Sequence, residues 1–317
     1  MTVEVPAGIA WWRARPGGAA WLERLPRLVE ECAAAWDLHV RAPFPDASVS
    51  FVAPAVLADG TQAVLKVNFP DAESEHEADA LVAWGGVGAV RLLAADAERR
   101  ALLVERCMPG TQLWGIADEE AANGAAAGVL RALWRPAPEG HGFRALEGEA
   151  RRWAQELPAR FERHGRPLDR ALLHRAIGWI GELIDAPDGP PVVVHQDLHG
   201  GNVLLAARGS SPSAVAPGPP PLWGRAGGQW LAIDPKPLVG ERAFDVASLL
   251  RDRRGELAAD PAPVRRIRRR LDQLAEALDL DRERMRRWAV VHALAWGLCD
   301  DEWFPELVAC ARWLDAA

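Results

Sequence analysis

The pattern of apolar and polar positions divides the chain into two parts. Between Val49 and Glu105, short apolar runs alternate with turns, as is typical of β-strands. Asp59-Gly60 lies between two such runs, and this dipeptide is a strong hairpin signal. The first part is therefore predicted to be β-β-α-β-β after an N-terminal helix, with the helices over 20–36 and 73–84 and the strands over 49–57, 62–68, 89–94 and 101–105.

After Pro109-Gly110 the pattern becomes helical. Leu173, Ile177 and Ile180, for example, recur at the spacing of one helix face. Asp260-Pro261 is interpreted as a helix cap followed by proline at the first helical position. Further helices are predicted over 118–134, 146–161, 171–184, 281–298 and 301–314.

Residues 208–228 are dense in proline, glycine and serine and fit neither a helix nor a strand. This segment is predicted to be a flexible insertion between two short strands, over 202–206 and 229–233. A loop of this length inside a domain is either functional or disordered.

Composition narrows the range of functions. At 49% hydrophobic, a chain of 317 residues can bury a sizeable core, and its length favours two domains. A net charge of −7 argues against nucleic acid as a partner and suits a cationic ligand. The four cysteines show no metal-binding spacing, no secretory signal is visible over 1–18, and no apolar run suggests a membrane span. A cytoplasmic protein with reduced thiols, without membrane contact and favoured as a monomer, is expected.

The sequence VVVHQDLHGGNVLL, over 192–205, carries the most specific chemistry. Asp197 and Asn202 are five residues apart after an apolar strand, which is the D-x-x-x-x-N spacing of a kinase catalytic loop. Asp197 is predicted to accept the proton of an attacking hydroxyl. Asn202 is predicted to bind Mg2+ without adding negative charge beside the phosphates of ATP. His195 and His199 are interpreted as structural hydrogen-bonding groups.

Three further residues complete the pattern. Lys66 lies in the strand-like run AVLKV, which matches the kinase strand whose lysine neutralises phosphate oxygens. Glu77 is preferred over Glu75 as the carboxylate that orients Lys66. Asp234 ends the apolar run WLAID, as a metal-binding aspartate does in kinases.

With these motifs in this order, the chain resembles the aminoglycoside phosphotransferase branch of the protein-kinase-like superfamily, and within it the streptomycin 6-kinase and hydroxyurea phosphotransferase family. The segments that carry the resemblance are ADGTQAVLKV, EADALVAWGGVGAVRLLAAD, VVHQDLHGGNVLL and WLAIDPKPLVGERAFDVASLL. The resemblance implies an α+β bilobal protein-kinase-like fold, with a β-rich N-terminal lobe over 1–107 and a mainly helical C-terminal lobe over 108–317. It also implies ATP-dependent transfer to a hydroxyl of a small molecule.

The chain departs from the family pattern in three places. The family usually has Gly-Asp and His-Pro-Gly-Asn in the catalytic loop, whereas here Gln196 precedes Asp197 and Gly200 follows His199. Pro237 replaces a glycine that is more usual after D-P-K. The insertion over 208–228 is long. None of these departures removes a predicted catalytic group. The identity of the acceptor stays open, because the insertion is a candidate to lie near the acceptor site.

The remaining nucleotide contacts are predicted from position. No G-x-G-x-x-G precedes Lys66, so backbone N–H groups and the hydroxyls of Ser48 and Ser50 are candidates to meet the phosphates, with a plain hairpin as the alternative. Backbone groups of Glu105 and Cys107 are candidates to pair with adenine.

Two more regions have open interpretations. Asp245 is either a helix cap or, as the resemblance implies, a brace for the catalytic loop. The acidic cluster Asp300, Asp301 and Glu302 beside Trp303 is a candidate site for a cationic acceptor, although acidic residues also commonly begin a helix.

Together these features predict an aminoglycoside kinase of the streptomycin 6-kinase type that inactivates the antibiotic. The alternatives are a kinase of hydroxyurea or of another small hydroxylated metabolite, and an inactive nucleotide-binding regulatory protein. Only two lysines occur in this arginine-rich chain. One is Lys66, and the other, Lys236, is predicted to face the transferred phosphate or the acceptor.

Overall fold

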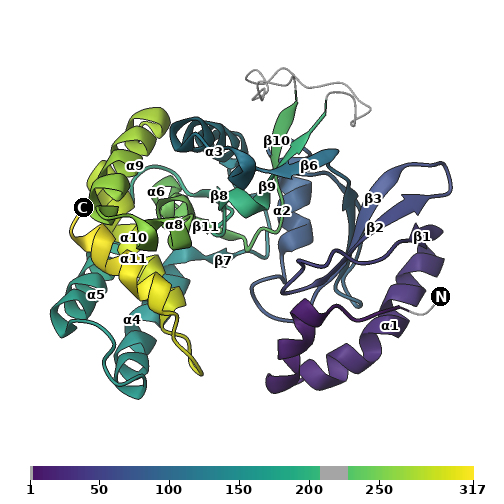
Figure 1. Cartoon of the computed structure of the whole chain (residues 1–317), viewed down its shortest axis with the longest axis horizontal. Helices are drawn as coiled ribbons and strands as arrows, with labels where there is room; N and C mark the ends of the chain where they lie inside the picture. The colour runs from purple at the N-terminus through teal and green to yellow at the C-terminus, as the bar shows by residue number, and fades with distance from the viewer. Residues whose placement is uncertain (1–2, 208–227) are drawn as a thin grey trace.

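The sheet of the N-terminal part forms because β-branched and apolar residues alternate with tight turns. The computed structural model describes residues 3–207 and 228–317, so the predicted insertion lies outside the described residues apart from Gly228. Figure 1 shows a β-rich part and a helical part side by side. All the pairings in the N-terminal sheet are antiparallel, in the order β1-β2-β3-β5-β4. Its strands are β1 (Leu38–Val40), β2 (Phe51–Leu57), β3 (Gln62–Val67), β4 (Leu92–Asp96) and β5 (Ala101–Glu105).

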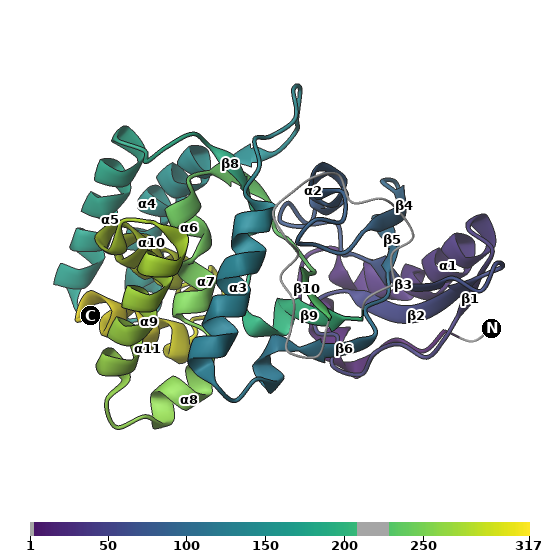
Figure 2. The ribbon, with the colours of Figure 1, turned by 90° about the horizontal axis from the view of Figure 1, so that it is seen from above.

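Three helical segments accompany this sheet. The 3-10 helix η1 (Ala7–Ala14) and helix α1 (Gly18–Ala35) pack beside it, with Leu25 and Val29 of α1 fully buried in the smaller of two apolar clusters. Helix α2 (Glu77–Trp84) lies between the sheet and the helical part, as Figure 2 shows from above. Its residues Leu81 and Trp84 belong to the larger cluster. The indole of Trp84 donates a hydrogen bond to the carbonyl of Leu133 (2.8 Å), so α2 is attached to the helical part.

The helical part holds the larger apolar cluster and two small sheets. One sheet has the order β10-β9-β6 and the other the order β7-β11-β8. Their strands are β6 (Pro109–Gln112), β7 (Arg144–Ala145), β8 (Val192–Val194), β9 (Val203–Ala206), β10 (Gln229–Ala232) and β11 (Leu238–Gly240). The helical segments are η2 (Leu113–Gly115), α3 (Glu119–Leu133), α4 (Leu146–Arg163), α5 (Arg170–Asp185), η3 (Gly200–Asn202), α6 (Arg242–Asp245), α7 (Ala247–Leu250), α8 (Arg254–Ala259), α9 (Pro263–Leu278), α10 (Arg282–Gly297) and α11 (Pro305–Asp315).

The predicted helices and strands are present, but several begin or end at residues other than the predicted ones. Asp118, the first residue of the helix predicted over 118–134, caps α3, since its carboxylate accepts hydrogen bonds from two backbone N–H groups of the first turn. The prediction for Pro261 was wrong. Pro263 is the first residue of α9, and Asp260 instead accepts a hydrogen bond from the backbone N–H of Ala262 (2.7 Å).

The acidic cluster does not begin the last helix. Helix α11 starts at Pro305, and residues 299–304 form a loop that is closed by a backbone hydrogen bond from Cys299 to Glu302 (3.0 Å). The interpretation as an ordinary helix start was therefore wrong. Over residues 3–207 and 228–317, no helix is long and apolar enough to span a membrane.

Candidate functional site

The centre of the site is Lys66, which lies on β3 and is buried. Its ammonium group donates hydrogen bonds to both carboxylate oxygens of Glu77 (2.7 and 2.8 Å) and to Oδ1 of Asp234 (2.9 Å). Burial opposes the charged form of Lys66, but the negative charges of Asp234 and Glu77 outweigh that effect and raise its pKa. Lys66 is therefore a fixed cation. The structure pairs it with Glu77, as predicted, rather than with Glu75.

Glu77 is itself held by Asn68, just after β3, and Asn68 is held by Ser50, just before β2. Asn68 donates from Nδ2 to Glu77 Oε2 (2.8 Å), and the hydroxyl of Ser50 donates to Asn68 Oδ1 (2.6 Å). All three side chains are buried. Ser50 was predicted to meet phosphates, but its proton is used inside this network, so it supports Glu77. Asn68 was missed, and its place two residues after Lys66 on the same strand face was the available signal.

Asn202 and Asp234 come from neighbouring strand ends. Asn202 precedes β9, and Asp234 follows β10, its antiparallel partner. The backbone N–H of Ile233 donates to the carbonyl of Asn202 (2.9 Å), so the two predicted metal ligands are neighbours. Asp234 has a φ of 57°. This left-handed turn ends the strand.

Asp197 has a cation beside each carboxylate oxygen. Lys236 Nζ lies 3.6 Å from its Oδ2, and Arg251 Nη2 lies 3.6 Å from its Oδ1. Burial favours the neutral acid, yet Lys236, His199 and Arg251 together lower the pKa of Asp197. Asp197 is thus an ionised carboxylate at neutral pH. Lys236 was singled out from the sequence, whereas Arg251 was missed because it lies 54 residues away among many arginines.

Trp296, on α10, forms a platform under both cations. Lys236 Nζ lies 4.3 Å from the centre of its ring, and the guanidinium carbon of Arg251 lies 4.8 Å from it. Cations over an indole face are attracted by its quadrupole. Lys236 also reaches across to Glu73, whose Oε2 is 3.0 Å from Nζ. Because Glu73 precedes α2, this pair links the N-terminal part to the helical part.

Asp245 holds the predicted catalytic loop through a hydrogen bond to its backbone. Its Oδ1 accepts from the backbone N–H of Gln196 (2.8 Å) and its Oδ2 from the indole of Trp134 (3.0 Å). Burial raises the pKa of Asp245 to about 6. Asp245 ends α6 and makes no cap bond, so the cap interpretation was wrong and the bracing one holds. Gln196, with a φ of 67°, is bound through its carbonyl by the hydroxyl of Ser248 (2.8 Å).

The two histidines of the loop have structural contacts, as predicted. Nε2 of His195 lies 2.9 Å from the carbonyl of Ile233, and its Nδ1 accepts from the backbone N–H of Asp197 (3.3 Å). Because a carbonyl only accepts, His195 is neutral with its proton on Nε2. Burial lowers its pKa to about 4. His199 accepts at Nδ1 from the backbone N–H of Gly201 (3.1 Å).

The predicted adenine contacts lie at the end of β5 (Glu105) and on the connection after it (Cys107). The carboxylate of Glu105 binds the backbone N–H (2.8 Å) and the side chain of Arg91, and its own N–H donates to the Arg91 carbonyl. Cys107 is buried, and burial raises the pKa of its thiol to about 12. Ser48 is exposed, and its carbonyl accepts from the indole of Trp11 (2.6 Å).

The loop over 299–304 has arginine partners. Asp300 accepts from Arg160 Nε (3.1 Å) and Arg163 Nη1 (3.1 Å), and Asp301 pairs with Arg15 of the N-terminal part. Two of the three predicted acceptor-binding carboxylates are thus partly neutralised. The fourth member of the predicted set, Trp303, is 37% exposed.

Comparison with known proteins identifies this arrangement. Residues 35–304 match the aminoglycoside/hydroxyurea antibiotic resistance kinase family. The chain belongs to that family. The streptomycin 6-kinase of Streptomyces glaucescens is 36% identical over 304 residues, covering 95% of this chain and 92% of the relative. The hydroxyurea phosphotransferase of Kitasatospora aureofaciens is also 36% identical, covering 95% of this chain and 82% of the relative.

Solved structures confirm the protein-kinase-like fold of this family member. The choline kinase LicA of Streptococcus pneumoniae has a TM-score of 0.59 at 12% identity, covering 93% of this chain and 100% of that one. The aminoglycoside phosphotransferase APH(4)-Ia has a TM-score of 0.57 at 16% identity, covering 92% and 97%. The predicted family and fold class are confirmed. The chain is a phosphotransferase that acts on a hydroxyl group.

The residues of this kinase fit a magnesium ion. An amide oxygen from Asn202 and a carboxylate from Asp234, whose side chain is 47% exposed, are the hard oxygen ligands that Mg2+ prefers. Mg2+ usually takes one or two protein ligands and fills its other positions with water and phosphate oxygens. The Nδ2 group of Asn202 donates to the carbonyl of Asp197 (3.0 Å), which leaves its Oδ1 for a ligand role.

Proposed function

We propose that the chain transfers the γ-phosphoryl group of ATP to the 6-hydroxyl of a streptomycin-type aminoglycoside and so inactivates the antibiotic. The observation that carries this proposal is the arrangement around Asp197: an ionised carboxylate next to a lysine, in the same loop as Asn202, the proposed metal ligand. The family supports an aminoglycoside or hydroxyurea kinase. Of these acceptors, we propose streptomycin.

In the proposed reaction, Asp197 accepts the proton of the acceptor hydroxyl as its oxygen bonds to the γ-phosphorus and the bond to the β-phosphate oxygen breaks. The products are the phosphorylated acceptor and ADP. Lys66 neutralises phosphate oxygens because Glu77 and Asp234 hold its ammonium in place. Asn202 and Asp234 would hold Mg2+, which supplies neutralisation of phosphate charge when bound.

The nucleotide is proposed to lie between the sheet and the catalytic loop. Related folds have been solved with AMP and with AMP-PNP. Ser48, which is exposed before β2, is proposed to meet the phosphates. Ser50 is proposed to support Glu77 through Asn68. Backbone groups of Glu105 and Cys107 are proposed to meet adenine.

The acceptor is proposed to enter between Glu73 and the loop over 299–304. Glu73 is 48% exposed and lies beside Lys236, which itself lies beside Asp197. Burial raises the pKa of the Cys299 thiol, and the negative charge of Glu73 adds to this effect, so Glu73 lies near the loop over 299–304. Glu302 and Trp303 are proposed to bind guanidinium groups of the acceptor by charge and stacking, while Asp300 and Asp301 shape the loop through their arginine partners.

A specific observation favours hydroxyurea as the second candidate. Lys236 and Arg251 both lie 3.6 Å from Asp197. A cationic group beside the reacting hydroxyl is repelled by these two residues, whereas neutral hydroxyurea is not. The 36% identity to a hydroxyurea phosphotransferase agrees with this alternative.

The deciding experiment is an acceptor panel. The purified enzyme with ATP and Mg2+ is incubated with streptomycin, other aminoglycosides, hydroxyurea and small sugars, and each mixture is analysed for an added phosphate by mass spectrometry. We expect streptomycin to have the highest kcat/KM. A higher kcat/KM for hydroxyurea would replace the proposal by the second candidate, and no magnesium-dependent ATP consumption with any acceptor would favour a regulatory protein.

A further inference from the structure

The turn between Asp197 and Asn202 is covered by an indole. Trp114 of η2 lies flat against the two glycines of this turn, Gly200 and Gly201, and stacks on His199 with ring centres 5.1 Å apart. A Cβ on Gly200 would lie 2.5 Å from Cδ1 of Trp114, and a Cβ on Gly201 would lie 2.7 Å from its Cζ3. Only glycine at both positions allows this contact.

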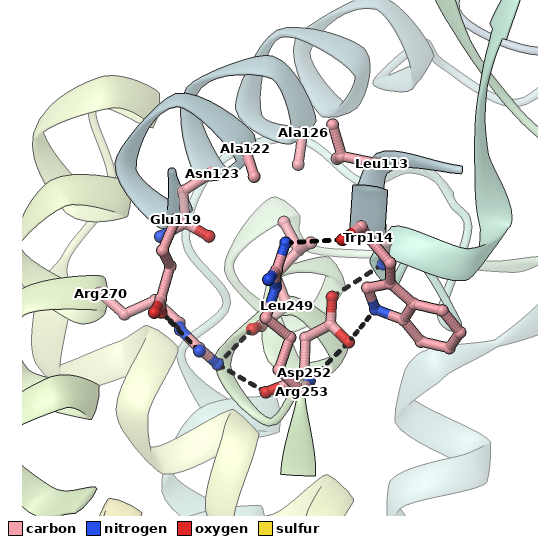
Figure 3. Close-up of a pocket in the computed structure, with 11 residues that line it drawn as sticks. Leu113, Trp114, Glu119, Ala122, Asn123, Ala126, Leu249, Asp252, Arg253 and Arg270 are labelled. Carbon is pink, nitrogen blue, oxygen red and sulfur yellow. Dashed lines mark hydrogen bonds and ion pairs between the residues drawn. The ribbon is translucent and has the colours of Figure 1, made fainter. Parts of the chain in front are cut away.

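A single carboxylate joins the indole to the turn. Asp252, just after α7, accepts from the backbone N–H of Gly200 at Oδ2 (2.8 Å) and from the indole N–H of Trp114 at Oδ1 (2.8 Å). Both hydrogen bonds are drawn in Figure 3. A proline at position 200 would have no N–H to donate. The hydrogen bond to Asp252 therefore requires a residue other than proline at position 200.

The backbone beside each of these two side chains is bound by an arginine. Arg253 donates from Nη2 to the carbonyl of Ile116 (2.6 Å), which holds η2, and Arg270 donates from Nη1 to the carbonyl of Asp252 (2.9 Å). Figure 3 shows these side chains around one small cavity, whose volume is about 10 Å³. That volume has room for about one water molecule and for no larger ligand, so the network is a support rather than a binding site.

The turn ends at Asn202, and its position follows from the turn. The backbone N–H of Asn202 donates to the carbonyl of His199 (2.8 Å), and its side chain donates to the carbonyl of Asp197 (3.0 Å). If the turn moves, both contacts of Asn202 change. Groups that orient a metal ligand from behind commonly control metal affinity about 10- to 100-fold.

We propose that Trp114 and Asp252 are positioning residues that hold the Gly200–Gly201 turn and thereby place the Asn202 oxygen for the metal. The inference rests on the proposed metal role of Asn202. It assigns to the reaction two residues outside the sets proposed above to bind the nucleotide and the acceptor.

The test is metal affinity rather than activity alone. Mn2+ binding to the full-length protein in the presence of AMP-PNP is measured by electron paramagnetic resonance for the wild type and for Asp252→Ala and Trp114→Phe. We expect about 10-fold weaker Mn2+ binding in Asp252→Ala and a smaller loss in Trp114→Phe, which keeps the ring but loses the N–H. Asp252→Asn should fall between Asp252→Ala and the wild type, because an amide oxygen replaces only one acceptor.

Matched controls separate positioning from stability. Asp272→Ala removes an exposed ion pair with Arg282, and Trp179→Phe changes a ring that packs against Arg286. Both variants should bind Mn2+ like the wild type. In steady-state kinetics, Asp252→Ala should raise the Mg2+ concentration for half-maximal rate about 10-fold and leave the KM of the acceptor unchanged. Wild-type Mn2+ affinity in both Asp252→Ala and Trp114→Phe would overturn the proposal.

Asn202→Ala distinguishes this inference from the proposed function. If Asn202→Ala weakens Mn2+ binding and Asp252→Ala does not, the metal role stands and the positioning proposal is wrong. If Asn202→Ala itself binds Mn2+ like the wild type, the metal role fails and the positioning proposal fails with it. Weakened binding in both variants, with unchanged controls, supports the proposal.

Discussion

The proposed nucleotide side and the proposed acceptor side of this kinase are built differently. Around Lys66, the buried Glu77 and the half-exposed Asp234 accept direct hydrogen bonds of 2.7 to 2.9 Å. Around Asp197, two cations lie 3.6 Å from the carboxylate. Farther out, the 299–304 loop carries side chains that are largely exposed.

This difference corresponds to what each side binds. A triphosphate is the same in every kinase, so its partners can be fixed and buried. The acceptor differs among relatives that share 36% identity with this chain, and its proposed partners lie on an exposed loop and on the residues before α2. Specificity is therefore expected to reside on the acceptor side.

The largest expected effect is on the proton acceptor. Asp197→Asn removes the group that takes the hydroxyl proton while keeping its shape, so kcat should fall roughly 10²- to 10⁴-fold. Nucleotide affinity, measured by calorimetry, should stay within about twofold of the wild type, since no described nucleotide-side contact is lost. Asp272→Asn is the matched control. Near-wild-type turnover of Asp197→Asn would mean that the two sides are wrongly assigned.

Lys66→Arg tests the fixed geometry of the nucleotide side. A planar guanidinium does not reproduce the compact ammonium that lies between Glu77 and Asp234, so kcat/KM for ATP should fall roughly 10²-fold although the charge is unchanged. Arg is also bulkier in a buried position. If Lys66→Arg retains wild-type kinetics with ATP, the contrast between a fixed and an adaptable side is refuted.

The buried loop histidine predicts a pH effect on stability. With a pKa of about 4 in the native state, His195 binds fewer protons than in the unfolded chain between pH 4 and about 6.5, so stability is lost as pH falls through this range. From pH 7 to pH 5 the loss due to His195 is about 2 kcal/mol. The free energy of unfolding of His195→Gln should therefore fall less over this range. The same slope in wild type and His195→Gln would contradict this, and His39→Gln, an exposed change, is the control.

The smallest expected effect concerns the acceptor side. Glu73→Gln removes the carboxylate that binds Lys236 near the proposed acceptor entrance. The KM of a cationic aminoglycoside should rise about fivefold, equivalent to about 1 kcal/mol for a partly exposed ion pair, and that of hydroxyurea should not change. Equal changes for the charged and neutral acceptors would show that Glu73 acts only through Lys236.

The nucleotide side could be predicted from sequence because its chemistry sits in short, ordered motifs. Lys66, Glu77 and Asp234 each occupy a strand end or a helix start that local patterns reveal, and they meet as the motifs predict. Their supports could not be predicted in the same way. Asn68 looks like any polar strand residue, and only its buried contacts with its neighbours identify it.

The acceptor side was less predictable because its contacts join distant segments. Arg251 and Trp296 reach Asp197 and Lys236 from helices far along the chain, in a sequence where arginine and tryptophan are common. The acidic loop looked like a helix start because its residue types suit both structures. Proline at 305 sets the actual start of α11.

The most direct test of the central claim is the position of the phosphate on streptomycin. The product of the wild-type enzyme with ATP and streptomycin is isolated, and phosphorus–proton coupling in its NMR spectrum locates the modified hydroxyl. The account predicts a single phosphate at the 6-hydroxyl, absent when Asp197→Asn replaces the wild type. Recovery of unmodified streptomycin beside phosphorylated hydroxyurea under the same conditions would contradict it.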